Sequence, residues 1–147
     1  NFQAEDETGS SAQLAPGTIV QFWKGDSTLI RKTLEKGFDI VNSYHIYTYL
    51  DYTYKKTPLE KAYSFSPIPE NIPAELKKHI LGLGCQMWTE WLPTCESAQK
   101  MIFPRIAAHA ETGWTAPESK NFTRFSNALQ GLLKHWDKVG IKYGDFK

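Results

Sequence analysis

Short apolar segments with strand character alternate along this chain with segments whose apolar residues recur every three or four positions. The first pattern is typical of buried strands and the second of amphipathic helices. The spacing predicts strands over residues 18–23, 38–42 and 80–88, and helices over residues 27–36, 74–78, 96–111 and 122–136. Gly37 should end the first helix, and Pro104 should end or kink the third. Alternation of this kind indicates an α/β fold in which helical crossovers join parallel strands.

Three parallel strands make an incomplete sheet. Parallel strands are normally buried on both faces, and each bare edge exposes backbone N–H and C=O groups that another element must cover. We therefore expect the chain to be part of a larger barrel or sheet, or to associate with a second copy. Residues 1–16 are polar, rich in acidic residues and Ser, and without periodicity, so a flexible lead-in is expected there and a folded region over residues 17–147.

The composition excludes several classes of function. With 17 basic and 16 acidic side chains the formal net charge is +1, so we expect no attraction to nucleic acid or to an anionic membrane. Cys85 and Cys95 lack the paired spacing of a zinc site, and the four histidines show no ligand pairing, so no metal and no cofactor are expected. Both thiols are expected to be buried or partly buried. No apolar run approaches the length that spans a membrane.

Aromatic rings and a carboxylate meet at the end of the third predicted strand, where Trp88, Glu90 and Trp91 follow an apolar run. The C–H face of a pyranose packs on an indole ring, and sugar hydroxyls donate hydrogen bonds to carboxylate oxygens. This combination favours a sugar site. The alternative is that both indoles are ordinary core or rim residues and that Glu90 is a solvated charge.

A second cluster follows the second predicted strand, in the aromatic segment over residues 43–54. Tyr49 and Asp51 are two residues apart, so in an extended segment both side chains point to one side while Leu50 turns into the wall. The alternative places Tyr49 in a packed aromatic loop and makes Asp51 the cap of a turn. In parallel barrels the reactive groups follow the carboxyl ends of the strands, and both clusters have that position.

Five blocks of the sequence together resemble the catalytic domain of glycoside hydrolase family 20, the β-N-acetylhexosaminidases. In family order they are QFWKGD at residues 21–26, YLDY at 49–52, KAYSFSPIP at 61–69, MWTEW at 87–91 and FPRIAAHAETGW at 103–114. The likeness extends from about Ala15 to the C-terminus. It implies the C-terminal part of a (β/α)8 barrel, about strands 6–8 with their helices. It also implies substrate assistance, in which the 2-acetamido oxygen of the substrate attacks the anomeric carbon and the protein holds that acetamide.

The resemblance implies a role for each matching site residue. Tyr49 would be catalytic and donate its phenolic O–H to the acetamido oxygen. Asp51 would accept a hydrogen bond from the sugar 6-hydroxyl, and Glu90 would accept one from the 4-hydroxyl. The indole rings of Trp23 and Trp88 would line the pocket around the acetamido group.

Five further residues carry expectations of their own. Phe65 stands where some family members have a Trp that extends toward the leaving-group sugar, so it is expected to bind substrate there. Arg105 and Glu111 are expected to form a structural ion pair, and Trp91 is expected to pack under a helix. The sequon that begins at Asn121 is expected to start a helix rather than to carry a glycan.

The resemblance leaves the catalytic groups incomplete. The Asp-Glu pair of the family, whose Glu protonates the glycosidic oxygen, matches no residue of this chain, so the chain alone is expected to be nearly inactive. The expected partners are a glycan that contains N-acetylhexosamine, and the N-terminal remainder of the barrel or a second copy. Three alternatives stay open: a non-catalytic carbohydrate-binding relic, a self-associating half-barrel without a ligand, and a relative that releases a disaccharide as lacto-N-biosidases do. A glycan-degrading activity favours an extracellular or cell-surface location.

Overall fold

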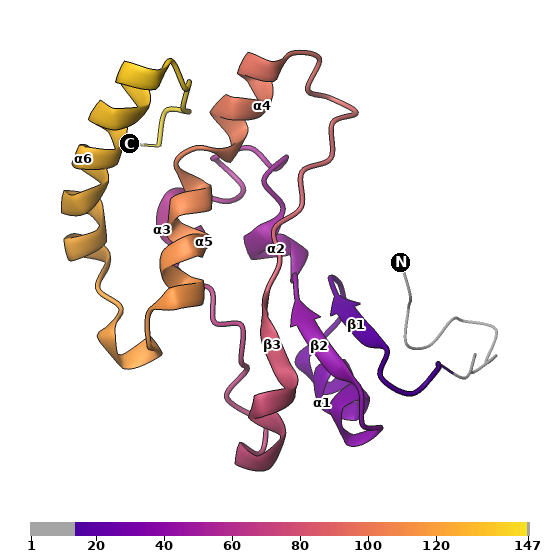
Figure 1. The fold of residues 1–147 in the computed structure, drawn as a ribbon. Helices are drawn as coiled ribbons and strands as arrows, with labels where there is room; N and C mark the ends of the chain where they lie inside the picture. The colour runs from indigo at the N-terminus through magenta and orange to yellow at the C-terminus, as the bar shows by residue number, and fades with distance from the viewer. Residues whose placement is uncertain (1–13, 147) are drawn as a thin grey trace. The chain divides into compact units, whose positions relative to one another are not determined.

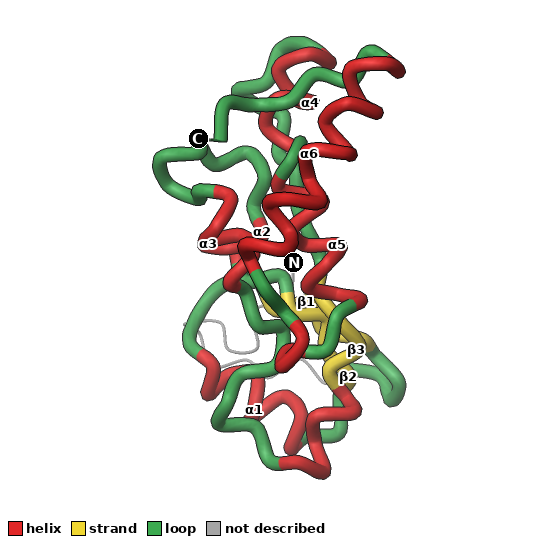
Figure 2. The backbone as a smooth tube through the Cα atoms, turned by 90° about the vertical axis from the view of Figure 1, so that its left-hand side faces the viewer, coloured by secondary structure: helices red, strands yellow, loops and turns green. Residues whose placement is uncertain are grey.

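The computed structural model describes residues 14–146, and these form two compact units. The strand unit comprises residues 14–44 and 67–84, and the helical unit comprises residues 45–66 and 85–146. The helices and strands of both units are labelled in Figure 1 and distinguished by colour in Figure 2. The expected lead-in over residues 1–16 lies outside the described residues except for its last three positions.

A three-stranded parallel sheet forms the strand unit, with the strands in the order β1-β2-β3 (Figure 1). The strands are β1 over Ile19–Phe22, β2 over Asp39–Asn42 and β3 over Ile80–Leu83. Ile40 pairs with Val20 on one side and with Ile80 on the other, and all three side chains are buried in one apolar row. The prediction that the third strand reaches residue 88 is wrong. Strand β3 ends at Leu83 because its pairing partner in β2, Asn42, is the last residue of that strand.

Helix α1, Ser27–Glu35, packs on this sheet through Ile30 and Leu34, each only 2% exposed. Asp26 begins the helix, since its carboxylate accepts a hydrogen bond of 2.7 Å from the Thr28 N–H. Gly37, at a φ of +84°, follows the end of the helix, as predicted. A short 3-10 helix, η1 over Ala74–His79, precedes β3, and Leu14 packs partly buried against the same apolar core.

The helical unit contains every other element of the described chain. These are α2 over His45–Thr48, α3 over Leu59–Ser64, α4 over Cys95–Ile102, α5 over Arg105–Trp114, η2 over Pro117–Ser119 and α6 over Phe122–Val139. The predicted helix over residues 96–111 is divided into α4 and α5 at Pro104, as the proline indicated. Helices α2 and α3 were not predicted, because helices of 4 and 6 residues are too short to show a periodic apolar pattern.

Helices α3, α5 and α6 share one apolar core. It is formed by Leu59, Ala62, Tyr63, Ala108, Phe125, Leu129 and Trp136. Asn121 begins α6, since its side-chain oxygen accepts a hydrogen bond of 2.9 Å from the Arg124 N–H, which confirms the helix start predicted there. Gly140, at a φ of +77°, ends the helix in the left-handed region that favours glycine.

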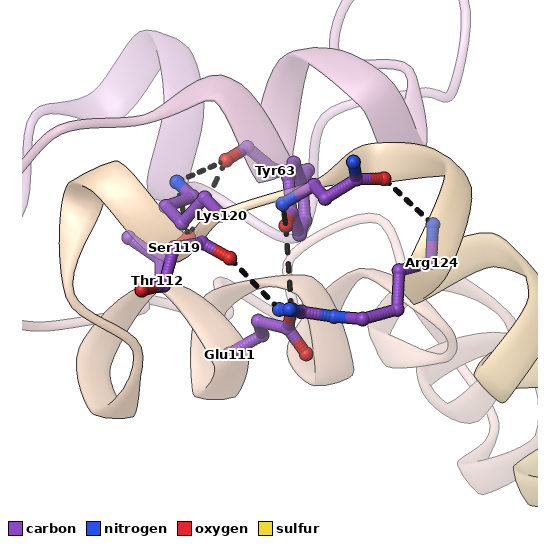
Figure 3. Close-up of polar contacts among 7 residues, drawn as sticks. Tyr63, Glu111, Thr112, Ser119, Lys120 and Arg124 are labelled. Carbon is purple, nitrogen blue, oxygen red and sulfur yellow. Dashed lines mark hydrogen bonds and ion pairs between the residues drawn. The ribbon is translucent and has the colours of Figure 1, made fainter.

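Lys120 ties the start of α6 to α3 and α5 (Figure 3). Its ammonium group donates to the Tyr63 carbonyl, to the Phe65 carbonyl at 3.1 Å and to the Thr112 hydroxyl at 3.0 Å. These acceptors include carbonyls at the carboxyl end of α3, where the last helical carbonyls lack partners within the helix. Lys120 therefore caps α3 from a segment 55 residues further along the chain.

Glu111 takes part in the same network, but its partner is not the one expected (Figure 3). Its carboxylate accepts a hydrogen bond from Arg124 at 3.1 Å and from the Tyr63 hydroxyl at 3.3 Å. The predicted ion pair between Arg105 and Glu111 is therefore wrong. The two residues are six positions apart on α5, a separation that turns their side chains to different faces of the helix.

Candidate functional site

Tyr49 and the aromatic residues around it, His45, Tyr52 and Trp88, form the Tyr49 cluster. They lie where two segments of the helical unit run side by side. Tyr49 and Gln86 form a parallel bridge. The Leu50 N–H donates to the Gln86 carbonyl at 2.8 Å, and the Gln86 N–H donates to the Thr48 carbonyl at 3.3 Å. This backbone pairing joins the segment after α2 to the segment that carries Trp88.

Tyr49 and Trp88 meet across this pairing. Their ring centroids are 6.3 Å apart with the planes inclined by 47°, and the tyrosine is 9% exposed while the indole is 42% exposed. Burial raises the pKa of Tyr49, and a hydrogen bond from the Trp88 side chain acts in the opposite direction. An indole N–H can only donate, so the Tyr49 hydroxyl oxygen is the acceptor in this hydrogen bond. The arrangement suits a neutral phenol that donates to a ligand oxygen.

The ring of Tyr49 is held on its other sides by two more aromatic side chains. The ring centroids of Tyr52 and His45 lie 5.6 Å and 5.7 Å from that of Tyr49, and His45 Nδ1 is 2.7 Å from the Tyr52 hydroxyl oxygen. A packed aromatic loop, which the sequence offered as the alternative to a site, is thus present. It fixes the ring while the neighbouring Trp88 keeps an exposed surface.

Asp51 lies in a turn and not in the extended segment that was expected. The Tyr52 N–H donates to the Tyr49 carbonyl at 3.4 Å, so the chain reverses here and the expected strand alternation does not apply. Leu50 is buried, as predicted. The Oδ1 atom of Asp51 is inaccessible and accepts no hydrogen bond from any residue over the described range 14–146. A buried acceptor without a partner is rare in folded proteins.

The loop after Gln86 exposes the remaining residues of the first cluster. Glu90 and Trp91 are both exposed, Trp91 to 91%. The Leu92 N–H donates to the Thr89 carbonyl at 3.0 Å, which closes a turn around both residues. The prediction that Trp91 packs under a helix is wrong, because this turn ends the alternation of side chains on which it depended. Glu90 lies on the same loop as Trp88, two residues further on.

Two further predicted site residues have surroundings of their own. Phe65 is 3% exposed, stacks on Tyr47 at a centroid distance of 5.3 Å and meets His109 edge-on at 6.5 Å, so it packs in the interior without a free face for a ligand. Trp23 belongs to the strand unit, where it directly follows β1, half-buried, with the Lys24 ammonium 5.8 Å from its ring centroid. That Trp23 lines the same pocket as the Tyr49 cluster stays a prediction.

Arg105 is a residue of this region that the sequence reasoning set aside. It is fully buried, and its guanidinium donates to the carbonyls of Leu50 and Tyr52, both at 2.6 Å, on either side of Asp51. It also donates to the carbonyls of Thr57 at 3.3 Å and Met101 at 2.6 Å. The signal in the sequence was an arginine followed directly by three apolar residues, where a buried charge must find acceptors.

His109 was also missed. It is 1% exposed, and both of its ring nitrogens are inaccessible to solvent. Burial, together with the nearby charge of Arg105, lowers the pKa of His109 to about 4. The ring is therefore neutral near pH 7 and packs as an apolar group beneath Phe65.

The cysteines and the other titratable groups offer no metal centre. Among residues 14–146, no group of three His, Cys, Asp or Glu side chains is placed to hold a metal ion, and no helix is long and apolar enough to cross a membrane. Cys85 is partly buried and Cys95 is exposed, and neither forms a disulfide. The expectation that both are buried is wrong for Cys95, which lies in the exposed first turn of α4.

Comparison with known proteins places these residues in a family. A family model described as "Glycosyl hydrolase family 20, catalytic domain" matches residues 4–117. A β-N-acetylhexosaminidase of Cellulomonas fimi is 31% identical over 147 residues, which cover 91% of this chain and 29% of that protein. A β-hexosaminidase of Porphyromonas gingivalis is 35% identical over 86 residues, which cover 58% of this chain and 11% of that protein.

Solved structures of the same family are also similar to this chain. The crystal structure of a GH20 exo-β-N-acetylglucosaminidase from Vibrio harveyi, in complex with N-acetylglucosamine, is 27% identical and superposes with a TM-score of 0.78, covering 90% of this chain and 22% of that one. The chain thus spans less than a third of the length of each of these relatives. The predicted fold class is confirmed: the chain is an α/β part of a (β/α)8 barrel. Because the family model matches most of its length and its relatives bear the same activity names, this chain belongs to glycoside hydrolase family 20.

Proposed function

We propose that the protein carrying this chain is a β-N-acetylhexosaminidase that removes terminal N-acetylglucosamine or N-acetylgalactosamine from glycans, with retention of configuration. Membership of family 20 supports the reaction class, and the Vibrio harveyi relative holds N-acetylglucosamine. The observation on this chain that carries the proposal is the pairing of a buried, neutral phenol at Tyr49 with the half-exposed indole of Trp88.

Tyr49 acts on the nucleophile in this mechanism. The nucleophile is the acetamido oxygen of the substrate itself, and the phenolic O–H of Tyr49 donates to that oxygen and holds it in line with the anomeric carbon. Fixing an intramolecular nucleophile in this way lowers the barrier by removing the entropy cost of bringing it into position. Burial raises the pKa of Tyr49, so the hydroxyl keeps the proton that it donates in this proposal.

The bond changes balance without a nucleophile from the protein. The acetamido oxygen forms a bond to the anomeric carbon as the bond to the leaving-group oxygen breaks, which gives an oxazolinium ion. The leaving-group oxygen takes a proton from a carboxylic acid that the family resemblance places outside this chain. Water then attacks the anomeric carbon from the face that the leaving group vacated, so two inversions give net retention.

The other candidate residues bind the sugar in this proposal. Asp51 accepts a hydrogen bond from the 6-hydroxyl. Trp88 packs its exposed face on the acetamido methyl, Trp23 forms a second wall, and Glu90 accepts from the 4-hydroxyl. Phe65, packed in the interior, supports the aromatic loop through Tyr47.

Turnover of matched aryl glycosides by the complete enzyme tests this proposal. We expect release of 4-nitrophenol from the N-acetyl-β-glucosaminide and the N-acetyl-β-galactosaminide, and none from the β-glucoside, which has a 2-hydroxyl in place of the nucleophile. A trifluoroacetamido substrate should react more slowly, because fluorine withdraws electrons from the attacking oxygen. Equal hydrolysis of the β-glucoside, or an α-anomer as the first product in NMR spectra, would contradict the mechanism.

A further inference from the structure

We infer that Arg105 is a positioning residue of the site, whose buried guanidinium fixes the backbone turn that presents Tyr49 and Asp51 to the sugar. The inference rests on the proposed function, because it gives Arg105 a task in the same site. Arg105 lies on α5, outside the loops that carry the candidate sugar-binding residues. It touches no ligand in this scheme and acts only through the turn.

The guanidinium uses all of its hydrogen-bonding capacity on backbone carbonyls. An arginine side chain has five N–H groups. Nη2 donates to Leu50 and Met101, Nη1 donates to Tyr52 and Thr57, and Nε donates to Met101 at 3.1 Å. Five hydrogen bonds therefore join the turn at Asp51, the loop before α3 and the end of α4 through one side chain.

An aromatic ring holds the plane of the guanidinium. The Cζ atom of Arg105 lies 4.3 Å from the ring centroid of Tyr54, and the Tyr54 hydroxyl donates to the Phe103 carbonyl at 2.7 Å. Both Tyr54 and its acceptor belong to the helical unit, as Arg105 does. The stacked ring and the fork of donors leave the guanidinium no room to rotate, so the carbonyls that it binds are fixed as well.

Neutral carbonyls make this an unusual site for a buried cation. An apolar side chain of similar volume would avoid the cost of burying a charge, but it would leave the carbonyls of the turn without donors. Burial lowers the pKa of Arg105, and the neighbouring Tyr54 and Asp51 act in the opposite direction. His109, packed nearby, is neutral near pH 7 and adds no charge of its own.

The five hydrogen bonds from Arg105 act as a clamp on the turn at Asp51. The position of the bound carbonyls explains why catalysis should depend on this clamp. Leu50 and Tyr52 flank Asp51, and Tyr49 directly precedes them. A shift of the turn would therefore displace the phenolic hydroxyl and the carboxylate together. Misplacement of a reacting group by about 1 Å can lower the rate of an enzyme by about 100-fold.

Substitution of Arg105 by lysine in the complete enzyme tests the inference. Lys keeps the positive charge but loses the planar fork, so it cannot hold the two sides of the turn at once. We expect R105K to lower kcat on the aryl N-acetylglucosaminide by roughly 10- to 100-fold, with a much smaller change in KM. Arg124→Lys is the matched control, since Arg124 lies on α6 in an exposed ion pair and should leave kcat unchanged.

Coupling to Tyr49 separates positioning from general support of the fold. If Arg105 acts through the turn, R105K should lower kcat less in a Tyr49→Phe background than in the wild type, because the hydroxyl that it positions is already absent and only the displacement of Asp51 remains. The variant should also discriminate less between substrate and its 6-deoxy analogue, which lacks the hydroxyl assigned to Asp51. Multiplicative effects in the double variant, with unchanged discrimination, would overturn the inference.

Two further measurements keep the outcome decisive. If R105K fails to fold, Tyr54→Leu removes the ring under the guanidinium and retains all five N–H donors of Arg105. This variant should lower kcat by less than the roughly 10- to 100-fold expected for R105K, and its effect should be smaller in a Tyr49→Phe background. An equal effect of Tyr54→Leu in both backgrounds would overturn the inference. If the wild type does not turn over the aryl substrate, the proposed function fails. The positioning role is then read from binding, since R105K should weaken binding of N-acetylglucosamine more than of its 6-deoxy analogue, and equal weakening would contradict it.

Discussion

Replacing Tyr49 by phenylalanine removes one hydroxyl and leaves the surrounding packing in place. The ring is 9% exposed and lies against Trp88, Tyr52 and His45, so a phenyl ring should occupy the same position. Loss of one preorganised donor to a reacting oxygen typically lowers kcat by about 10²–10³, or about 3–4 kcal/mol of transition-state stabilisation. Trp88 also loses an acceptor, but its indole is 42% exposed and water replaces that bond at little cost. We therefore expect Tyr49→Phe to lower kcat and to leave KM nearly unchanged.

The assay is initial-rate hydrolysis of the 4-nitrophenyl N-acetylglucosaminide by the complete enzyme over a range of pH. Because burial raises the pKa of Tyr49 above its usual value of 10.0, the phenol keeps its proton at neutral pH. The ratio of wild-type to variant kcat should accordingly stay constant from acid to neutral pH. Tyr63→Phe is the control, since it removes a buried hydroxyl bound to Glu111 and should affect stability and not kcat. A loss in Y49F below about tenfold, or a ratio that varies with pH, would refute the assigned role.

Three other perturbations have outcomes fixed by the structure. As the pH falls from 6.5 toward 4, His109 is protonated in the unfolded chain but stays neutral in the folded one, so the free energy of unfolding should decrease by up to about 3 kcal/mol. Urea titrations at several pH values should show this decrease in the wild type and not in His109→Leu. Lys120→Met leaves the partly buried carbonyls of Tyr63 and Phe65 without this donor, so the free energy of unfolding should fall by about 1–3 kcal/mol. Arg124→Met breaks an exposed ion pair and should lower the same free energy by less than about 1 kcal/mol. Iodoacetamide should modify Cys95 well before Cys85, since Cys95 is exposed while burial raises the pKa of the Cys85 thiol to about 12; peptide masses after timed alkylation measure the order.

Local sequence patterns were sufficient to predict helices with a periodic apolar face and helix ends marked by a proline. Helix α6 follows from apolar residues spaced over five turns, and the division of α4 from α5 follows from Pro104, which cannot continue a helix. The three parallel strands follow from β-branched and aromatic runs between helices. Each of these signals is contained within a single segment of the chain.

Features that depend on distant segments were not predictable in the same way. The end of β3 is set by the end of β2, and the exposure of Trp91 is set by a turn that the strand pattern does not reveal. The acceptors of Arg105 are carbonyls up to 55 residues away, which no spacing within α5 indicates. Of the candidate site, the sequence singled out Tyr49 and Trp88, whose rings the structure brings together, but it did not indicate the carbonyls that Arg105 binds.

The bridge between Tyr49 and Gln86 is made by main-chain atoms, and this has a bearing on how substrate preference can diverge. Exchange of the side chain at Trp88 or Glu90 leaves in place the amide and carbonyl groups of Thr48, Leu50 and Gln86 that hold the two loops adjacent. Backbone pairing of this kind does not depend on side-chain identity, which agrees with a TM-score of 0.78 to a structure that is only 27% identical. Directed evolution of new glycan preferences should begin with side chains on these two loops and leave their main-chain contacts untouched.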